Sequence, residues 1–200
     1  MNTDTSGTDT REQLMRATYR VLAERGFANL TTQRVADEAD CSQSLVHYHY
    51  DTKEDLVVTF LEWVLEQETE WLEGLADGSA ERRLRRFLDA QLSIPVDEEH
   101  ARFNVAFVEL ATAAARNERY RAVLTAFSER QQATLVEIIR DGIEAGEFSE
   151  VPAESTARFL RYALQGAVQA DLTLDDPEAK SQTEAAVDAY VEGMLLGGRD

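Results

Sequence analysis

A short segment between residues 31 and 53 gathers side chains whose hydrogen-bonding groups suit them to contact nucleic acid. Glutamine can pair with adenine through two hydrogen bonds, serine can bond to several bases, and leucine can contact the methyl group of thymine. These three residue types stand next to one another in the segment. We therefore expect them to read base sequence: Gln43, Ser44 and Leu45.

A second set of side chains in the same segment could bind the phosphate backbone of DNA. Hydroxyl, phenol, imidazole and ammonium groups can donate to phosphate oxygens, which fixes the position of a protein without reading sequence. The expected phosphate contacts are Thr31, Thr32, His47, Tyr48 and Lys53. The alternative is that these polar residues form only the solvated side of a small helical bundle. An aromatic residue on that side, close to one of only two lysines in the chain, favours the DNA-binding interpretation.

The spacing of the apolar residues predicts the elements that would position these side chains. The segment 31–50, TTQRVADEADCSQSLVHYHY, has the length and rhythm of a helix-turn-helix motif. Thr31 and Ser42 are suitable N-caps for two short helices, and a turn at Asp40 would separate them. The second helix would then bury Val46 and offer its N-terminal side chains to a major groove.

Longer helices are predicted on both sides of this motif. The first spans about residues 11–25, where Thr10 and Gln13 have the spacing of a capping box. A second capping box, formed by Thr52 and Asp55, would open a long helix directly after the motif. The motif and the first helix together predict a three-helix head.

Helical periodicity continues along the rest of the chain, and no alternating pattern predicts a strand. Breaks at glycine, asparagine and proline separate five further helices, at about residues 80–94, 98–115, 118–145, 153–172 and 177–196. We therefore predict an all-α fold of nine helices, with the head at residues 9–55 and a helical body at residues 56–200.

Several residues in and around the motif recur in a set order and spacing. They are the run LAERGF from Leu22 to Phe27, then Thr31, Val35, Ala36, Ser42, Val46, Tyr48, His49, Tyr50, Lys53, Glu54 and Leu56. In this pattern the sequence resembles the TetR family of transcriptional regulators, and the stretch 103–170 is similar to the regulatory domain of the choline-responsive branch. The resemblance implies a homodimeric repressor that binds a palindromic operator and responds to a small-molecule effector.

Four positions depart from the residues that are usual in this family. The family has glycine at Asp40, tyrosine at His47, phenylalanine at Tyr50 and a basic or small residue at Gln43. Aspartate adopts the left-handed turn conformation at modest cost, so we expect the fold to be retained. Because a base-reading position differs, the operator sequence cannot be copied from relatives.

The chain is strongly acidic, with 38 Asp and Glu against 20 Lys and Arg and a formal net charge of −18. Only Lys53 and Lys180 are lysines. At molar salt the Debye length falls to about 3 Å, and the self-repulsion of such a chain largely disappears. We therefore expect a halophilic, haloarchaeon-like source. The rival interpretation is an ordinary acidic protein of a low-salt organism.

The predicted head is acidic as well, because six bases stand against ten acids between residues 1 and 55. Affinity for DNA would then depend on hydrogen bonds, shape and bridging water or cations more than on counterion release. We expect a shallow or even inverted salt dependence of DNA binding. The alternative function is a helical protein-interaction module whose head has lost DNA binding.

Aromatic residues on the body helices are candidates for an effector pocket. The pocket set comprises Trp63, Phe103, Phe107 and Phe127, with Asn104 and Tyr162 as polar groups. The alternative is that these side chains only fill the core, because any bundle of this size needs aromatic residues inside it.

The last two predicted helices carry faces of small and apolar residues, which allow helices to approach closely. We expect these faces to form a two-fold symmetric four-helix dimer interface, as a palindromic operator requires. The interface set is Ala163, Leu164, Gly166, Ala167, Val187, Tyr190 and Met194. The alternative is that the two faces pack within one chain.

No catalytic residue, metal site or cofactor is predicted. Cys41 is the only cysteine, which excludes an intrachain disulfide and a cysteine-based zinc site. His47 and His49 are two residues apart on a predicted helix, so they point in different directions and cannot chelate one ion. No phosphate-binding loop or nucleophile motif supports an enzyme. A polar N-terminus and the lack of a long apolar stretch predict a cytoplasmic protein.

Overall fold

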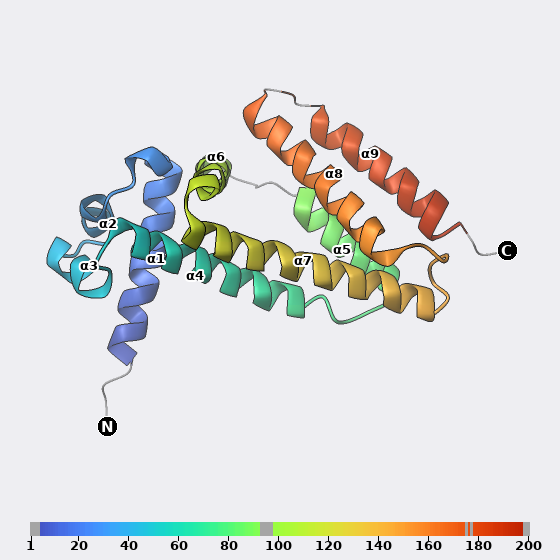
Figure 1. Cartoon of the computed structure of the whole chain (residues 1–200), viewed down its shortest axis with the longest axis horizontal. Coiled ribbons are helices and arrows are strands. Elements are labelled where there is room, and N and C mark those ends of the chain that lie inside the picture. The colour runs from blue at the N-terminus through green and yellow to red at the C-terminus, as the bar shows by residue number, and fades with distance from the viewer. Residues whose placement is uncertain (1–4, 93–97, 175, 177, 198–200) are drawn as a thin grey trace. The chain divides into compact units, whose positions relative to one another are not determined.

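The computed structural model describes residues 5–92, 98–174, 176 and 178–197, with the backbone alone at residues 5–9 and 194. Throughout these residues the regular elements are helical and no strand occurs (Figure 1). The all-α prediction with nine α-helices is confirmed for this part of the chain. None of the helices described is both long enough and apolar enough to cross a membrane.

The elements follow the predicted order. They are α1 (Thr5–Arg25), η1 (Phe27–Asn29), α2 (Thr32–Glu38), α3 (Gln43–His49), α4 (Lys53–Glu73), α5 (Ala80–Leu92), α6 (Glu98–Ala113), η2 (Ala114–Arg116), α7 (Glu118–Glu144), α8 (Ala153–Thr173), α9 (Ala179–Tyr190) and the π-helical segment η3 (Val191–Leu195). The helix ends predicted at residues 94 and 177 lie outside the described residues.

Side-chain caps begin the two short helices of the motif, as the sequence predicts. At the start of α2, Thr31 Oγ1 accepts a hydrogen bond from the N–H of Arg34 at 3.2 Å. At the start of α3, Ser42 Oγ accepts from the N–H of Leu45 at 3.2 Å. Between the two helices Asp40 has a φ of 51°, which is the predicted left-handed turn. The local sequence thus fixes both helix starts.

The two predicted capping boxes of the longer helices have different outcomes. The box at α4 is confirmed, because Thr52 Oγ1 accepts from the N–H of Asp55 at 3.1 Å and Asp55 Oδ2 accepts from the N–H of Thr52 at 3.0 Å. The box at Thr10 and Gln13 is wrong, because α1 begins before them and both residues are inside the helix. Gln13 Nε2 instead donates to the carbonyl of Ala39 at 2.6 Å, which ties α1 to the end of α2.

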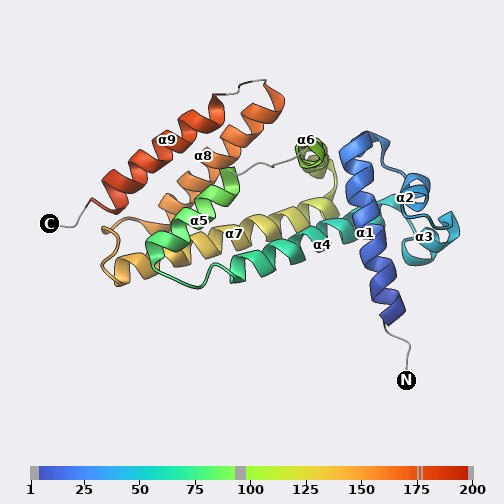
Figure 2. The same cartoon turned by 180° about the vertical axis from the view of Figure 1, so that it is seen from behind.

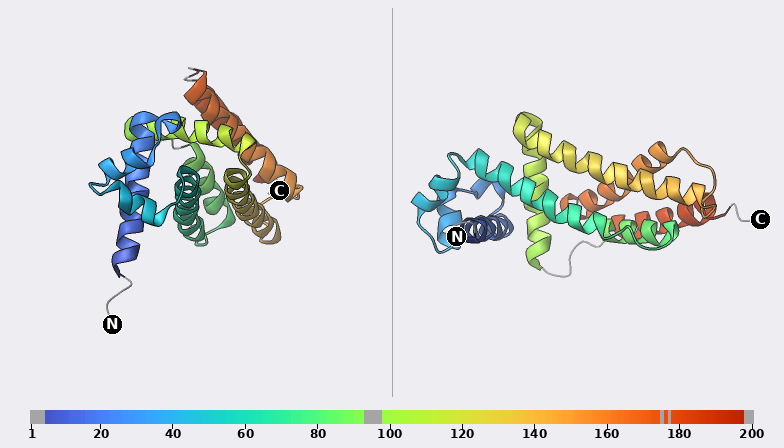
Figure 3. Two further views of the ribbon diagram at one scale, coloured as in Figure 1. Left: turned by 60° about the vertical axis from the view of Figure 1, so that its left-hand side comes forward. Right: turned by 90° about the horizontal axis from the view of Figure 1, so that it is seen from below.

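The chain divides into two compact units, which differ from the predicted head and body. Unit 1 comprises residues 1–67 and 95–125, and unit 2 comprises residues 68–94 and 126–200. The first part of α4, the whole of α6 and the start of α7 therefore group with the head. The reason is that α6 packs on α1 and on η1, and the right-hand view of Figure 3 shows α6 crossing beside α1.

Each unit has its own apolar core, and burial of each large side chain contributes about 1.5–3 kcal/mol. In unit 1 the fully buried side chains include Leu14, Met15, Leu22, Leu30, Leu56, Phe60 and Leu110. In unit 2 they include Leu75, Leu84, Phe87, Leu135 and Ile138. Within unit 2, α8 packs on α5, and α8 and α9 lie side by side (Figure 2).

Candidate functional site

Helix α3 has one face in the core of unit 1 and one face in solvent. Val46 is fully buried and Tyr50 is 7% exposed, which holds the helix against the core. Gln43 and Ser44 are exposed, and Leu45 is half-buried at the margin. The first turn of α3 therefore presents two of the predicted base-reading side chains to solvent and the third in part.

The last turn of α3 carries an aromatic side chain in solvent. Tyr48 is 83% exposed, whereas tyrosine is usually at least partly covered in folded chains. Its ring meets the ring of His49 edge to face, with centroids 5.3 Å apart, and His47 is exposed beside it. A phenol at the tip of an exposed ring can donate to a phosphate oxygen.

The two predicted threonine contacts lie at the start of α2. Thr31 is exposed and Thr32 is half-buried. The hydroxyl oxygen of Thr31 already accepts the capping hydrogen bond, but its own hydrogen is still available as a donor. Thr31 can therefore cap α2 and contact a phosphate at the same time.

Lys53 is held by the protein rather than extended into solvent. Its ammonium donates to the carbonyl of Phe27 at 3.3 Å and lies 4.7 Å from the centroid of the Phe27 ring. Burial lowers the pKa of Lys53 from its ordinary value. In this conformation the lysine fixes the chain after α1, and a phosphate contact would require it to exchange partners.

All six basic side chains of residues 10–55 have an acceptor within the chain. Four arginines lie within ion-pair distance of a carboxylate, Arg34 donates to the carbonyl of Asn29, and Lys53 donates to Phe27. The pairs are Arg11 with Glu66, Arg16 with Glu12, Arg20 with Glu38, and Arg25 with Glu24. Part of the donor capacity of each basic side chain is therefore already used within the chain, whereas the neutral donors of this surface need give up no ion pair to meet a phosphate.

Phe27, the first residue of η1, contacts three later helices of the chain. Glu109 of α6 accepts from its backbone N–H at 2.8 Å, and Lys53 of α4 donates to its carbonyl. The ring of Phe27 also meets Tyr120 of α7 edge to face, with centroids 6.3 Å apart. The start of the helix-turn-helix motif is thus tied to later helices of unit 1.

Four of the predicted pocket residues lie in unit 1. Trp63, Phe103 and Phe107 pack against its core, and the rings of Phe103 and Phe107 have centroids 6.0 Å apart. The indole of Trp63 donates to Glu12 Oε2 at 2.8 Å, and Asn104 is half-buried. All four side chains are partly buried at the margin of this core.

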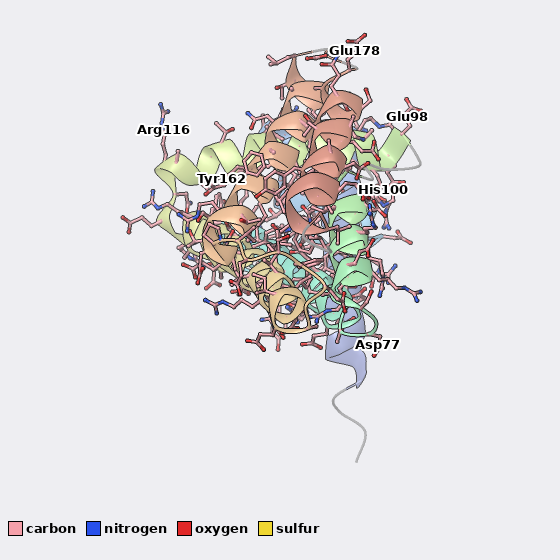
Figure 4. All side chains as sticks on the ribbon, turned by 90° about the vertical axis from the view of Figure 1, so that its right-hand side faces the viewer. Asp77, Glu98, His100, Arg116, Tyr162 and Glu178 are labelled. Atoms are coloured by element: carbon pink, nitrogen blue, oxygen red, sulfur yellow. The ribbon has the colours of Figure 1, made fainter. Side chains whose placement is uncertain are left out.

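The other two predicted pocket residues lie in unit 2, near a polar cluster that sequence reasoning did not find. Phe127 is half-buried on α7, and Tyr162 is 57% exposed on α8, where it is labelled in Figure 4. The cluster joins α4, α7 and α8. Its members are Glu68, Ser128, Gln131, Gln132 and Arg161.

Hydrogen bonds define the geometry of this cluster. Arg161 is 9% exposed, and its guanidinium donates to Ser128 Oγ at 3.0 Å, Gln131 Oε1 at 3.2 Å and Gln132 Oε1 at 3.3 Å. The amide of Gln131 in turn donates to Glu68 Oε1 at 2.5 Å. Burial raises the pKa of Glu68 to about 7, although the bond from Gln131 and the charge of Arg161 oppose that rise.

A signal in the sequence could have revealed the cluster. Each of its three main members occupies a position where helical periodicity expects an apolar core residue. They share a helix face with a buried leucine three or four residues further on: Glu68 with Leu72, Gln131 with Leu135, and Arg161 with Leu164. Three helices that each carry a polar residue on the core-facing side are unusual, and this pattern indicates a functional site.

The predicted dimer residues on α8 and α9 fall into different environments. Leu164, Ala167 and Val187 are at most 5% exposed, so their side chains lie in the core of unit 2 and offer little surface to a partner. Ala163 and Tyr190 are half-buried, and Gly166 is exposed. The side chain of Met194 lies outside the described residues.

An apolar surface nevertheless remains on these two helices. Phe159 and Tyr162 of α8 are 52% and 57% exposed. Phe159 also lines a groove of about 350 Å³ whose wall consists mostly of small and apolar side chains. It is lined by Phe159, Ala163, Ala179, Gln182, Thr183, Ala186 and Val187.

Two family models match the chain. Residues 14–59 match the model of bacterial regulatory proteins of the tetR family. Residues 80–196 match the C-terminal domain of BetI-type transcriptional repressors. The first match includes the whole helix-turn-helix motif, and the second includes most of the remaining helices.

Individual relatives agree with these matches over nearly the whole chain. A TetR transcription regulator from Haloarcula marismortui is 35% identical, with a TM-score of 0.87, over 94% of this chain and 99% of that one. The nicotine-responsive transcriptional repressor HdnoR of Paenarthrobacter nicotinovorans is 26% identical over 96% of this chain and 98% of its own. A transcriptional regulator from Saccharomonospora viridis, solved in complex with choline, has the same fold, with 21% identity and a TM-score of 0.82 over 94% and 98% of the two chains.

Proposed function

This chain belongs to the TetR family of DNA-binding transcriptional regulators, and on that premise we propose that it is a homodimeric repressor of a palindromic operator. The observation that carries the proposal is the division of α3 between a buried face and a solvent face. Val46 and Tyr50 hold the helix, while Gln43, Ser44 and Tyr48 are left for DNA. The proposal assigns binding chemistry to these residues and no catalysis.

Separate roles follow for the exposed residues. Gln43 and Ser44 read base edges, with Leu45 against a thymine methyl at the margin of the contact. Thr31, Thr32, His47 and Tyr48 donate to phosphates, and Lys53 joins them only by leaving the carbonyl of Phe27. Hydrogen bonds from neutral groups therefore supply most of the affinity.

The dimer is proposed to form through α8 and α9. Phe159 and Tyr162 expose aromatic surface there, and the groove that Phe159 lines also has small residues that a second helix could approach. A two-fold axis would present two copies of α3 to half-sites about one helical turn apart, or a multiple of it. Such symmetry matches a palindromic operator.

We infer that a small molecule regulates this binding and that the protein works in concentrated salt in the cytoplasm. Two relatives bind or respond to compounds that carry a basic or quaternary nitrogen, namely nicotine and choline. The excess of acids over bases supports the expectation of high salt, and the 35% identical relative comes from Haloarcula marismortui. An effector that binds the DNA-free form more tightly would release the operator.

Selection from a random pool of duplex DNA tests the proposed function. The full-length protein is incubated with the pool in molar KCl, and bound sequences are recovered and sequenced over several rounds. We expect enrichment of an inverted repeat. A variant with both Gln43→Ala and Tyr48→Ala should fold with the same helix content and enrich nothing. Equal behaviour of wild type and variant would instead support the protein-interaction module.

A further inference from the structure

We propose that the Glu68 carboxylate is the group that recognises the effector, and that the effector carries a positively charged nitrogen, as an amine or a quaternary ammonium. This inference rests on the proposed function, because it names the ligand class and the binding group of the regulatory half of the protein. Nothing in the DNA-binding motif takes part in it.

The first observation is an oxygen without a partner. Glu68 Oε1 accepts from the amide of Gln131 at 2.5 Å, but Oε2 is buried and has no hydrogen-bond partner among the described residues. A buried carboxylate oxygen usually has a donor, because leaving it unsatisfied costs free energy. The position therefore suits a donor or a positive charge that arrives with a ligand.

The second observation is that Arg161 acts on Glu68 through its charge, which lowers the pKa of the carboxyl, while its hydrogen bonds go to neutral groups. Arg161 donates to Ser128, Gln131 and Gln132, all of which are uncharged. Gln131 lies between the two charged groups, since its Oε1 accepts from Arg161 and its Nε2 donates to Glu68. These two bonds fix the orientation of the amide, which lies between the guanidinium and the carboxylate.

Aromatic residues stand one helical turn from the carboxylate and its amide partner. Phe127 precedes Gln131 by four residues on α7, and Trp71 follows Glu68 by three residues on α4, so each pair shares a helix face. Both rings are only partly buried. Aromatic faces attract cationic nitrogens, quaternary ones included, which cannot donate a hydrogen bond.

Binding of a cation should displace a proton from Glu68. With a pKa of about 7 the carboxyl group is partly protonated at neutral pH, whereas a cation next to Oε2 favours the ionised form. Arg161 is the one charged residue among the causes of the shift, and its charge lowers the pKa of Glu68, against the rise that burial produces. Ligand binding and proton release are therefore linked at this site.

Calorimetry of the full-length protein tests the inference, with choline, nicotine and tetramethylammonium as cationic probes. Dimethylbutanol, the neutral carbon analogue of choline, is the matched uncharged probe, and molar KCl is kept constant. At least one cation should bind wild type, and Glu68→Gln should weaken it roughly tenfold or more, since a contact with a charged group is worth about 1.5–3 kcal/mol. Glu70→Gln, at an exposed position on the same helix, should bind like wild type.

Repeating the titration in buffers with different ionisation enthalpies measures the proton release. Wild type should release a fraction of a proton at pH 7 and none at pH 9, whereas Glu68→Gln should release none at either pH. Thermal unfolding of both variants shows that they fold. A purely structural role for Glu68 would not produce this pattern.

Three results would overturn the inference. They are equal affinity of wild type and Glu68→Gln, equal affinity for choline and dimethylbutanol, and no binding of any of the three cations. Operator binding is measured in the same buffers so that the two proposals are tested separately. DNA binding without a response to cations overturns only the inference, whereas cation binding without DNA binding overturns only the proposed function.

Discussion

Glu109 Oε2 on α6 accepts a hydrogen bond at 2.8 Å from the backbone N–H of Phe27, the second residue after the end of α1. The same carboxylate lies 3.2 Å from the place that a Cβ atom would take on Gly26, where φ is 74°. Glycine adopts this conformation without steric strain, and its lack of a side chain admits the carboxylate. The contact therefore links α6 to the entry of the helix-turn-helix motif.

Removing this link should destabilise the protein modestly. Glu109→Ala leaves the N–H of Phe27 to solvent, and because the glutamate is exposed we expect a loss of about 1 kcal/mol in the free energy of unfolding. Urea denaturation measures the change. The control Glu129→Ala removes an exposed carboxylate from the middle of α7, and it should change stability by less than about 0.5 kcal/mol. Equal effects of the two variants would show that the contact is not formed in solution.

Stability should depend on pH through Glu68. The folded-state pKa is about 7 against an ordinary value of 4.5, so the folded protein holds this proton more tightly than the unfolded chain does. Below pH 4.5 Glu68 is protonated in both the folded and the unfolded state, so its ionisation does not change the free energy of unfolding. Between pH 4.5 and 7 only the unfolded state ionises, and the free energy of unfolding falls as the pH rises.

Glu68→Gln should remove this loss of stability at higher pH, because glutamine does not ionise. We expect the variant to be more stable than wild type by about 2 kcal/mol at pH 8, a value reduced from the full shift because the side chain is partly exposed, and nearly equal at pH 4.5. Denaturant titrations at both pH values measure the difference. A variant that is less stable at pH 8 would mean that the ionised carboxylate is well satisfied in the folded protein.

A charge placed on the exposed apolar surface of α8 should break the proposed dimer. Phe159 is 52% exposed, and the loss of an aromatic side chain at the centre of an interface costs about 2 kcal/mol or more of binding free energy. Phe159→Arg should therefore raise the dimer dissociation constant at least about thirtyfold. Sedimentation equilibrium measures the constant, with Ala133→Arg at an exposed position of α7 as the control. An unchanged constant for Phe159→Arg would place the interface on another surface.

Operator binding should weaken only slightly as salt rises. A protein that neutralises phosphates with lysine and arginine loses affinity with a log–log slope of about −0.9 for each phosphate contacted. Here the basic side chains of the head already have acceptors in the chain, and neutral donors face the solvent. We expect a slope no steeper than about −2 for each protomer in KCl titrations. A slope of about −5 would show that the arginines leave their partners on DNA.

Much of the head could be predicted from sequence because its signals are local. A cap needs only a hydroxyl and an N–H three residues later, and the caps of α2 and α3 occur where Thr31 and Ser42 predict them. The turn at Asp40 is also local. The failure at Thr10 shows the limit, because a capping pattern inside a longer helix looks the same as one at its start.

The tertiary contacts of Lys53 and Glu68 were harder to predict, because their partners are distant in the chain. Lys53 looked like a free phosphate contact, yet the carbonyl that holds it belongs to Phe27, which the helical pattern does not bring near it. Glu68 and Arg161 come together only through Gln131, after three helices have packed. Periodicity marks each as a polar residue in a core register, but it does not say which residues meet.

Fluorescence anisotropy of the selected operator duplex, titrated with wild type and with Gln43→Ala in molar KCl, tests most directly whether α3 reads DNA. We expect wild type to bind the duplex tightly and scrambled DNA not to compete for it. Gln43→Ala should lose about 1–3 kcal/mol of binding free energy, with relaxed preference at one base pair of each half-site. Equal affinity of both proteins for operator and scrambled duplex would contradict the assignment of α3 as the helix that reads DNA.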